Sequence, residues 1–329
     1  MRIRDKIKRP RRPVVAYEIL PPREKDGTLN SYAETISSLL SQTHIDAINI
    51  PEVRDEERQG DKPVKSLARA EPREFGQLLQ DIVGVEAIIN RVVVHQALDE
   101  ELRWVKETNQ KYEIENLIVV GGESHKVDYP GPSVKEALKT ITGQINSNGG
   151  NILCGGISIP RRKKESKNLI KKSQYGAEFF TTQVLYDASK TMKMISHYQR
   201  RCEELNTFPR RVLLSFAPVS SQKNIDFLKW LGVDIPADTE KYLNGRPGAM
   251  IDRSLDVAIE ILNDTLDHII KNKLVVPIGL NVEHIMNYNF QSSVEMLQEL
   301  ARIYREFCIK ADFYVKITLL FLLFSRQFF

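Results

Sequence analysis

The sequence predicts an α/β protein built as a single (β/α)8 TIM barrel. Short runs of branched and aromatic residues alternate with longer amphipathic segments along the chain, which is typical of a parallel sheet covered by helices. Eight such pairs fit into 329 residues, as a barrel requires. A doubly wound sheet is the competing fold, but no GxGxxG follows the first run and no break in the rhythm separates two domains.

The expected elements follow one another in a regular order. The strands are short apolar runs, expected at 14–20, 45–50, 91–95, 116–121, 151–158, 178–184, 210–216 and 274–280. The helices are longer amphipathic segments, expected at 31–42, 71–82, 98–109, 133–147, 163–175, 187–205, 221–231, 252–271 and 290–310. The stretch 232–249 is rich in glycine and proline, so we expect a long loop there.

The two ends of the chain differ in composition from its middle. We therefore divide it into a basic tail at 1–13, the barrel at 14–311 and an apolar extension at 312–329. The tail lacks the interleaved aromatic residues of a nucleic-acid site and the apolar segment of a secretory signal, so we expect a solvated lead-in that binds no nucleic acid. The apolar run of the extension is shorter than the ~20 residues that span a bilayer, so we expect no stable membrane insertion.

The cysteines indicate the compartment. Cys154, Cys202 and Cys308 lie far apart and have no CxxC spacing. This pattern supplies neither the ligands of a zinc site nor a disulfide framework. We therefore expect a cytoplasmic protein without a bound metal.

Polar residues at the carboxyl ends of the expected strands are the candidates for a site, because the active sites of such barrels lie at that end. Glu18 stands out, since an acid inside an apolar run is costly unless it is used or paired. Gln183 ends another apolar run in the same way. The other candidates at strand ends are Asn49, Glu52, His95, Gln96, Glu123, Ser124, His125, Ser158, Ser215 and Asn281.

Glycines and basic residues near strand ends suggest where phosphates would bind. Gly121 and Gly122, like the pair at 155–156, would let a flat ligand or its phosphates approach the backbone, although tight turns and barrel packing explain such glycines equally well. Arg161 follows the fifth strand at the rim, where a pyrophosphate would lie. The lysines that follow it are read as a solvated helix face.

Five segments of the chain, taken in order from about 14 to 310, resemble the methylenetetrahydrofolate reductase family. "YEILPPRE" is similar to the family's opening strand, and "ENLIVVGGES" to its fourth strand and turn. "LIKKSQYGAEFFTTQVLYD" and "LLSFAPVSSQKNIDFLKWLGVDIP" are similar to the segments around its sixth and seventh strands. "IGLNVEH" is similar to the eighth strand with its asparagine.

The resemblance implies an FAD-dependent barrel of one-carbon metabolism and methionine biosynthesis that reduces 5,10-methylenetetrahydrofolate, or a related pterin, to its 5-methyl form with NADH or NADPH. Glu18 then matches the catalytic general acid. A carboxyl group must be protonated near neutral pH to serve in this way, and burial raises its pKa. Gln183 matches a pterin-binding glutamine whose amide suits a heterocycle edge, and Asn281 and Glu123 complete the expected substrate contacts.

The resemblance also implies the cofactor site. Lys172 matches a cation for the flavin phosphates or ribityl oxygens, and His95 aligns near residues that touch the flavin. The turn Gly121-Gly122-Glu123-Ser124 replaces an Arg-Gly-Asp-like turn of the family, which puts folate specificity in doubt. The remaining expected cofactor contact is Arg161.

Two other functions stay open. The first is a flavin- or pterin-binding subunit that takes electrons from a partner protein. The second is a flavin-free pterin methyltransferase, which leaves Gly121, Gly122 and Lys172 without a role. The sequence is also compatible with a homo-oligomer.

Overall fold

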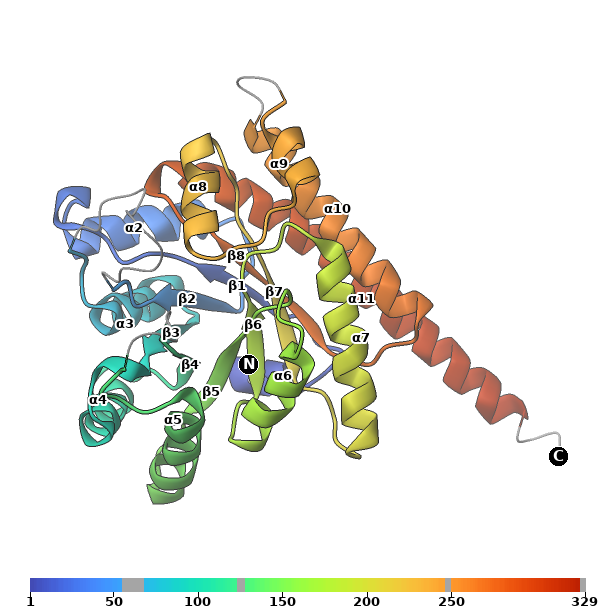
Figure 1. The fold of residues 1–329 in the computed structure, drawn as a ribbon, viewed down its shortest axis with the longest axis horizontal. Coiled ribbons are helices and arrows are strands. Elements are labelled where there is room, and N and C mark those ends of the chain that lie inside the picture. The colour runs from blue at the N-terminus through green and yellow to red at the C-terminus, as the bar shows by residue number, and fades with distance from the viewer. Residues whose placement is uncertain (55–67, 123–127, 246–249, 326–329) are drawn as a thin grey trace.

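Eight parallel strands close into a barrel in chain order, which confirms the predicted fold class (Figure 1). The structure is a computed structural model that describes residues 1–54, 68–122, 128–245 and 250–325, with the backbone alone for Asn148 and 311–325. Each strand pairs in parallel with its neighbours, and β1 (Val15–Glu18) pairs with both β2 (Ala47–Pro51) and β8 (Ile278–Glu283). The other strands are β3 (Glu86–Val92), β4 (Asn116–Val120), β5 (Leu153–Ser158), β6 (Phe179–Thr182) and β7 (Arg211–Phe216).

Two strands differ from the prediction. The third begins at Glu86 rather than 91, and the residues that follow it, Val93–His95, form a 3-10 turn. Its Asn90 and Arg91 are polar but buried, so hydropathy alone hides the strand. The eighth runs over Ile278–Glu283 rather than 274–280, because the apolar residues before Pro277 belong to the preceding loop.

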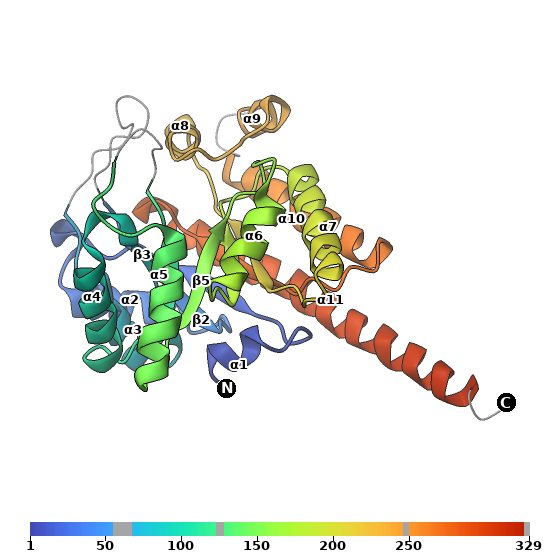
Figure 2. The same ribbon diagram turned by 60° about the horizontal axis from the view of Figure 1, so that its bottom comes forward.

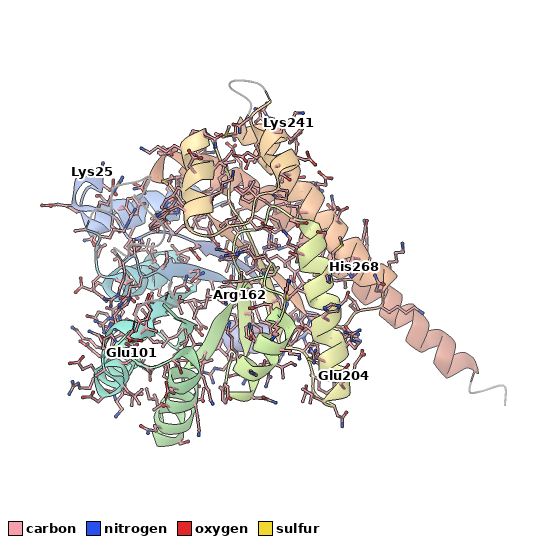
Figure 3. The ribbon with its side chains drawn as sticks, viewed as in Figure 1. Lys25, Glu101, Arg162, Glu204, Lys241 and His268 are labelled. Carbon is pink, nitrogen blue, oxygen red and sulfur yellow. The ribbon has the colours of Figure 1, made fainter. Side chains whose placement is uncertain are left out.

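The helices surround the barrel, as predicted (Figure 2). Their bounds are α1 (Ile3–Ile7), α2 (Leu29–Leu40), α3 (Pro72–Val83), α4 (Leu98–Gln110), α5 (Val134–Thr140), α6 (Glu165–Gln174), α7 (Ala188–Glu204), α8 (Gln222–Trp230), α9 (Ala237–Leu243), α10 (Met250–Lys271) and α11 (Phe290–Ser325). Charged side chains such as Lys25, Glu204 and Lys241 lie on the outer surface (Figure 3).

Three of these elements correct the expectations. The stretch 232–249, expected to be a loop, contains α9. The expected helix 133–147 is α-helical only over α5 and continues as a π-helical turn at Ile141–Ile145. Helix α11 runs on past residue 311 and projects beyond the barrel (Figure 1). Among the described residues, no helix is both long and apolar enough to cross a membrane.

The interior of the barrel has an apolar lower half. Side chains alternate along each strand, so Ala16, Ala47, Ile88 and Leu213 point inward and form one cluster. Helix α1 covers this end of the barrel, with Ile3 and Ile7 in the same cluster. Polar residues border this cluster at the amino end, where Asn116 Nδ2 donates to Glu86 at 3.0 Å, and a second polar layer lies at the carboxyl end of the strands.

The basic N-terminal segment is therefore more than a solvated lead-in, although most of its cations are exposed. The Arg211 guanidinium, buried at the base of β7, donates hydrogen bonds to the carbonyl oxygens of Lys6 and Arg9 at 3.2 and 2.7 Å. Lys6 pairs with Asp46, and the backbone N–H of Ile3 donates to Glu86 at 3.2 Å. These contacts hold α1 against the lower end of the barrel.

We expect Ile7→Ala to lower the free energy of unfolding by about 2–5 kcal/mol, because it leaves a cavity in the cluster under the barrel. Chemical denaturation measures this value. Arg12→Ala is the control from the same segment, since Arg12 is exposed, and it should change stability by less than about 0.5 kcal/mol. Equal losses in both variants would contradict a packing role for α1.

Candidate functional site

Glu18 lies inside the barrel at the carboxyl end of β1, surrounded by side-chain amides. The Nδ2 atom of Asn49, on β2, donates to its Oε2 atom at 2.6 Å. Asn90 on β3 and Asn281 on β8 place their Nδ2 atoms 3.4 Å from the same oxygen. Three strands beside or near β1 thus direct amide donors at one carboxylate oxygen.

The environment of Glu18 favours the protonated acid. Removal from water raises its pKa from 4.5 to about 7, and the amides of Asn281 and Asn90 offset only part of this effect. No ion pair joins Glu18 to a cation within the part of the chain that the structure describes. Near neutral pH, the group is therefore poised to give up a proton, as a general acid must be.

A second acid, Glu283, lies beside Glu18 and was not among the candidates from the sequence. Glu18 and Glu283 are register partners on the adjacent strands β1 and β8. Asn281 Nδ2 lies 3.2 Å from Glu283 Oε1, so one amide contacts both carboxyl groups. Burial and the nearby charge of Glu18 raise the pKa of Glu283 well above its usual value. The error in the bounds of the eighth strand hid this residue.

Hydroxyl groups continue the polar layer around the barrel. Asn281 Nδ2 also donates to Ser215 Oγ on β7 at 3.1 Å, and Ser215 Oγ lies 3.1 Å from Thr181 Oγ1 on β6. Ser215 and Asn281 are completely buried. The strand-end candidates Ser215, Asn49 and Asn281 thus join Glu18 in one network.

Two amide oxygens in this layer have no hydrogen-bond partner among the residues that the structure describes. Asn49 and Asn90 both direct Nδ2 at Glu18, and their Oδ1 atoms are buried without a hydrogen bond. A buried acceptor without a partner is costly. These oxygens are suited to accept N–H groups from a flat heterocycle at the mouth of the barrel.

His284 contacts the backbone of Glu18 from the outer face of the barrel wall. Its backbone N–H and its Nδ1 atom both lie 3.4 Å from the carbonyl oxygen of Glu18. Its ring packs edge-on against Phe290, with centroids 5.8 Å apart. Burial lowers its pKa to about 4, so the imidazole is neutral near neutral pH.

Gln183 follows β6 at the same end of the barrel but bonds elsewhere. Its Nε2 donates to the carbonyl oxygen of Leu231 at 2.9 Å, and no hydrogen bond to Glu18 occurs among the described residues. Arg161 lies next to it, since a Cβ at Gly232 would come 3.2 Å from Arg161 Nη2 and 3.8 Å from Gln183 Nε2. The structure thus brings Gln183 and Arg161 together at the rim.

The expected flavin-binding turn lies partly outside the described residues, which leave out Glu123, Ser124 and His125. At Gly122, a Cβ would come within 2.2 Å of the ring of Tyr129. The same ring packs edge-on against His95, with centroids 5.4 Å apart. Gly121 is crowded by Val134, because a Cβ at this glycine would come 3.0 Å from the valine side chain. The side chains of Tyr129 and Val134 therefore occupy the space beside Gly122 and Gly121.

Lys172 is a residue of α6, and its side chain reaches β5 on the outer side of the barrel wall. Its Nζ donates to the carbonyl oxygen of Ile157 and lies 3.9 Å from Glu165 Oε1. Burial lowers its pKa. Gly155 faces inward, where a Cβ would meet the ring of Phe179 at 2.5 Å, so barrel packing explains this glycine.

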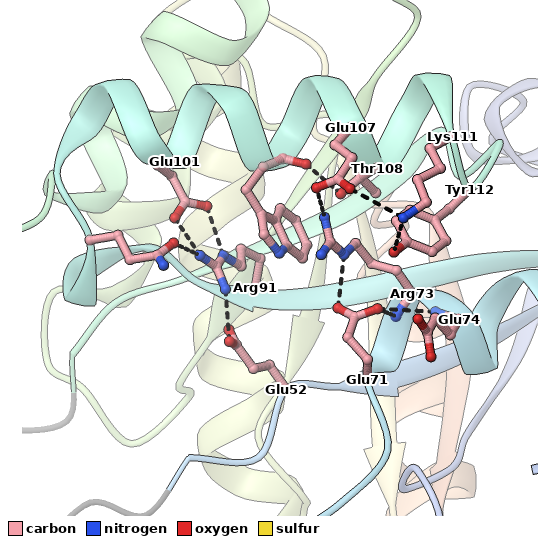
Figure 4. Close-up of polar contacts among 12 residues, drawn as sticks. Glu52, Glu71, Arg73, Glu74, Arg91, Glu101, Glu107, Thr108, Lys111 and Tyr112 are labelled. Atoms are coloured by element: carbon pink, nitrogen blue, oxygen red, sulfur yellow. Dashed lines mark hydrogen bonds and ion pairs between the residues drawn. The ribbon is translucent and has the colours of Figure 1, made fainter.

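Glu52 and Gln96, both candidates at strand ends, bind a buried arginine. Figure 4 shows this residue, Arg91, between Glu52 and Glu101. Arg91 donates to Glu52 at 2.7 Å and to Glu101 at 2.8 Å, and Gln96 accepts from the same guanidinium. The guanidinium lies 4.2 Å from the ring centroid of Trp104. Because Glu52 and Gln96 are hydrogen-bonded to Arg91, which also stacks on Trp104, we assign them a structural role in the wall of the barrel.

A cavity of about 580 Å³ opens beside the loops that follow β1, β2 and β3. Pro21, Glu52, Arg69 and His95 are among its lining residues. It lies at the carboxyl end of the strands, as does Glu18. No group of three or more potential metal ligands occurs within the described ranges.

The chain was compared with known proteins. The family model described as methylenetetrahydrofolate reductase matches residues 2–301. A solved structure from Clostridium thermocellum, described as binding two copies of 5-methyl-5,6,7,8-tetrahydrofolic acid, is similar at 20% identity and a TM-score of 0.73, covering 92% of this chain and 99% of that one. A 2,3-dimethylmalate lyase shares 12% identity at a TM-score of 0.44, covering 79% of this chain and 96% of that one.

No curated protein matches the chain in sequence. The similarity to the Clostridium structure supports the fold, and the family model covers the barrel from α1 to the first part of α11. The chain therefore belongs to the methylenetetrahydrofolate reductase family.

Proposed function

We propose that this protein reduces 5,10-methylenetetrahydrofolate, or a closely related one-carbon pterin, to its 5-methyl form, with hydride from NADH or NADPH passed through FAD. The observation that carries the proposal is the raised pKa of Glu18 inside a ring of amides at the mouth of the barrel. Family membership supports it, as does the Clostridium structure described as binding 5-methyltetrahydrofolate. A cytoplasmic location is part of the same proposal.

Glu18 is the proton donor in this proposal. The bond between the methylene carbon and N10 of the folate breaks as N10 takes the proton, and Glu18 is left as a carboxylate. The amide donors of Asn49, Asn90 and Asn281 then stabilise the new charge. They bear no charge of their own, so they do not hold the resting acid ionised as a cation would.

The other polar groups bind the substrate. The free Oδ1 atoms of Asn49 and Asn90 are suited to N–H groups of the pterin ring. Gln183 would release Leu231 to bond a second edge of the heterocycle, and Arg161 beside it would pair with a negatively charged part of the ligand. Glu123 stays a proposed contact from the sequence.

The described residues fit FAD at its ring more closely than at its phosphates. The two buried amide oxygens without partners suit a flavin ring as they suit a pterin. His95 and Arg161 lie at the carboxyl end of the barrel and would hold the ring and a phosphate, while Gly121, Gly122 and Ser124 would shape the turn beside it. FAD, when bound, supplies the hydride that the folate carbon receives.

Two observations favour a second candidate, a folate-binding barrel that holds no flavin. Lys172, the expected cation for flavin, is engaged by Ile157 and Glu165 on the outer side of the wall. The side chain of Tyr129 also fills the space in front of Gly122. Such a barrel would act as a partner-dependent subunit or a pterin methyltransferase.

Flavin binding separates the two candidates. We expect the purified protein to show flavin absorption, or to acquire it when FAD is added, and to lose this absorption under anaerobic NADH or NADPH. Heat-denatured protein with the same FAD is the control. A protein that stays colourless but binds 5-methyltetrahydrofolate in calorimetry would establish the flavin-free candidate instead.

We expect Glu18→Gln to retain FAD and its reduction by the nicotinamide but to reduce the folate at least about 100-fold more slowly, because an amide cannot act as the acid. Stopped-flow spectroscopy measures the two half-reactions separately. Glu260→Gln, an exposed site on α10, is the control and should leave both rates unchanged. Equal losses in both half-reactions of Glu18→Gln would argue against the assigned role.

A further inference from the structure

Glu283 has no role in the reaction as proposed, although it lies in the same polar layer as the acid. It is the register partner of Glu18 across the β1–β8 pair. Both side chains point into the barrel, as Asn281 does two residues before Glu283, because side chains alternate along a strand. Glu283 is therefore a second half-buried acid in this layer, and the reaction as proposed gives it no role.

The hydrogen bonds around the two acids bring no positive charge, although Asn49 and Asn90 donate to Glu18, and Ser215 and Asn281 to Glu283. Asn281 Nδ2 carries two hydrogens but lies within bonding distance of three acceptors, namely Glu18 Oε2, Glu283 Oε1 and Ser215 Oγ. No arginine, lysine or histidine forms an ion pair with either acid within the described ranges. Two like charges so placed repel each other in a region of low dielectric constant.

The other titratable groups nearby do not relieve this repulsion. Tyr186 donates its hydroxyl to the carbonyl oxygen of Ala217 at 2.9 Å, and burial raises its pKa, so it stays neutral. His284 lies on the other side of the strand and is also neutral near neutral pH. The groups that face the pair from β2, β3 and β7, namely Asn49, Asn90 and Ser215, are uncharged.

We propose that Glu283 is a positioning residue for Glu18: the two carboxyl groups hold one proton between them, and the pair keeps that proton available for Glu18 to give to the substrate. Like-charged carboxyl groups in close contact titrate as a pair, with one pKa raised. The inference rests on the proposed function for its catalytic meaning, but the pairing itself does not.

The buried amide oxygens of Asn49 and Asn90 point independently to a ligand in the same place. They lie next to Glu18 and accept no hydrogen bond from any described residue. A ligand that donates to both would rest its ring over Glu18, with Glu283 at the side. The shared proton therefore lies where a bound heterocycle would receive it.

The pairing has a measurable effect on stability. An acid with a raised pKa in the folded state destabilises that state as the pH rises above its unfolded value, here 4.5, and most strongly above its folded value. Repulsion between Glu18 and Glu283 adds to this loss only when both can ionise. The two residues should therefore interact near about pH 8 and not near about pH 4.

A double-mutant cycle tests the pairing without any substrate. Urea unfolding of the wild type, Glu18→Gln, Glu283→Gln and the double variant at both pH values gives the interaction between the two acids. We expect the effects to be non-additive only at the higher pH. A cycle of Glu18→Gln with Glu260→Gln should be additive at both. Additivity of the Glu18 and Glu283 effects at both pH values would overturn the proposal.

Kinetics tests the catalytic part. In Glu283→Gln we expect the apparent pKa of the folate half-reaction to fall by about one unit, which slows that step about tenfold above neutral pH and leaves flavin reduction by the nicotinamide unchanged. Glu283→Asp keeps the charge and should restore the wild-type profile. An unchanged pH profile in Glu283→Gln would overturn the role, whereas absence of reductase activity in the wild type would refute only the proposed function.

Discussion

The placement of Glu18, half-buried and with no ion-pair partner among the described residues, is the constraint on which the upper half of this barrel depends. Transfer of a carboxylate from water into protein is costly, and only paired or hydrogen-bonded charges persist there. Here the compensation comes from the amides of Asn49, Asn90 and Asn281, on three different strands. Because amides donate hydrogen bonds without adding charge, they hold the side chain in place and still leave its pKa near 7.

The lower half of the barrel makes this arrangement possible. Helix α1 covers the amino end of the strands with Ile3 and Ile7, so the apolar inward residues there are shielded from water. Arg211 ties the following turn to the base of β7 and β8 through backbone carbonyl oxygens. With α1 packed at the amino end, the polar layer around Glu18 lies toward the carboxyl ends of the strands, where the sites of such barrels are found.

The alternation of strand and helix patterns along the sequence predicted much of the fold. Single polar residues inside apolar runs predicted part of the site. Glu18 was found because the rest of its strand is apolar. Glu283 and Asn90 were missed because the polar side chains of β3 and the apolar loop before β8 displaced the expected strands. Alternation from Asn281 would have placed Glu283 on the inner face. Contacts between segments far apart in the chain, such as that of Gln183 with Leu231, produce no local sequence pattern from which they could be predicted.

The acids of this barrel fall into two groups, those paired with a cation and those surrounded by amides. Glu52 and Glu101 bind Arg91 and serve as fixed negative charges in the wall. Glu18 and Glu283 face amides, hydroxyls and each other. An arginine near them would stabilise the carboxylate and remove the proton that an acid catalyst needs. A second carboxyl group has the opposite effect, because it makes ionisation of the first more costly and so preserves the proton. In our proposal, the same residue type thus stabilises the wall or holds a transferable proton, according to whether its partner is a cation or another acid.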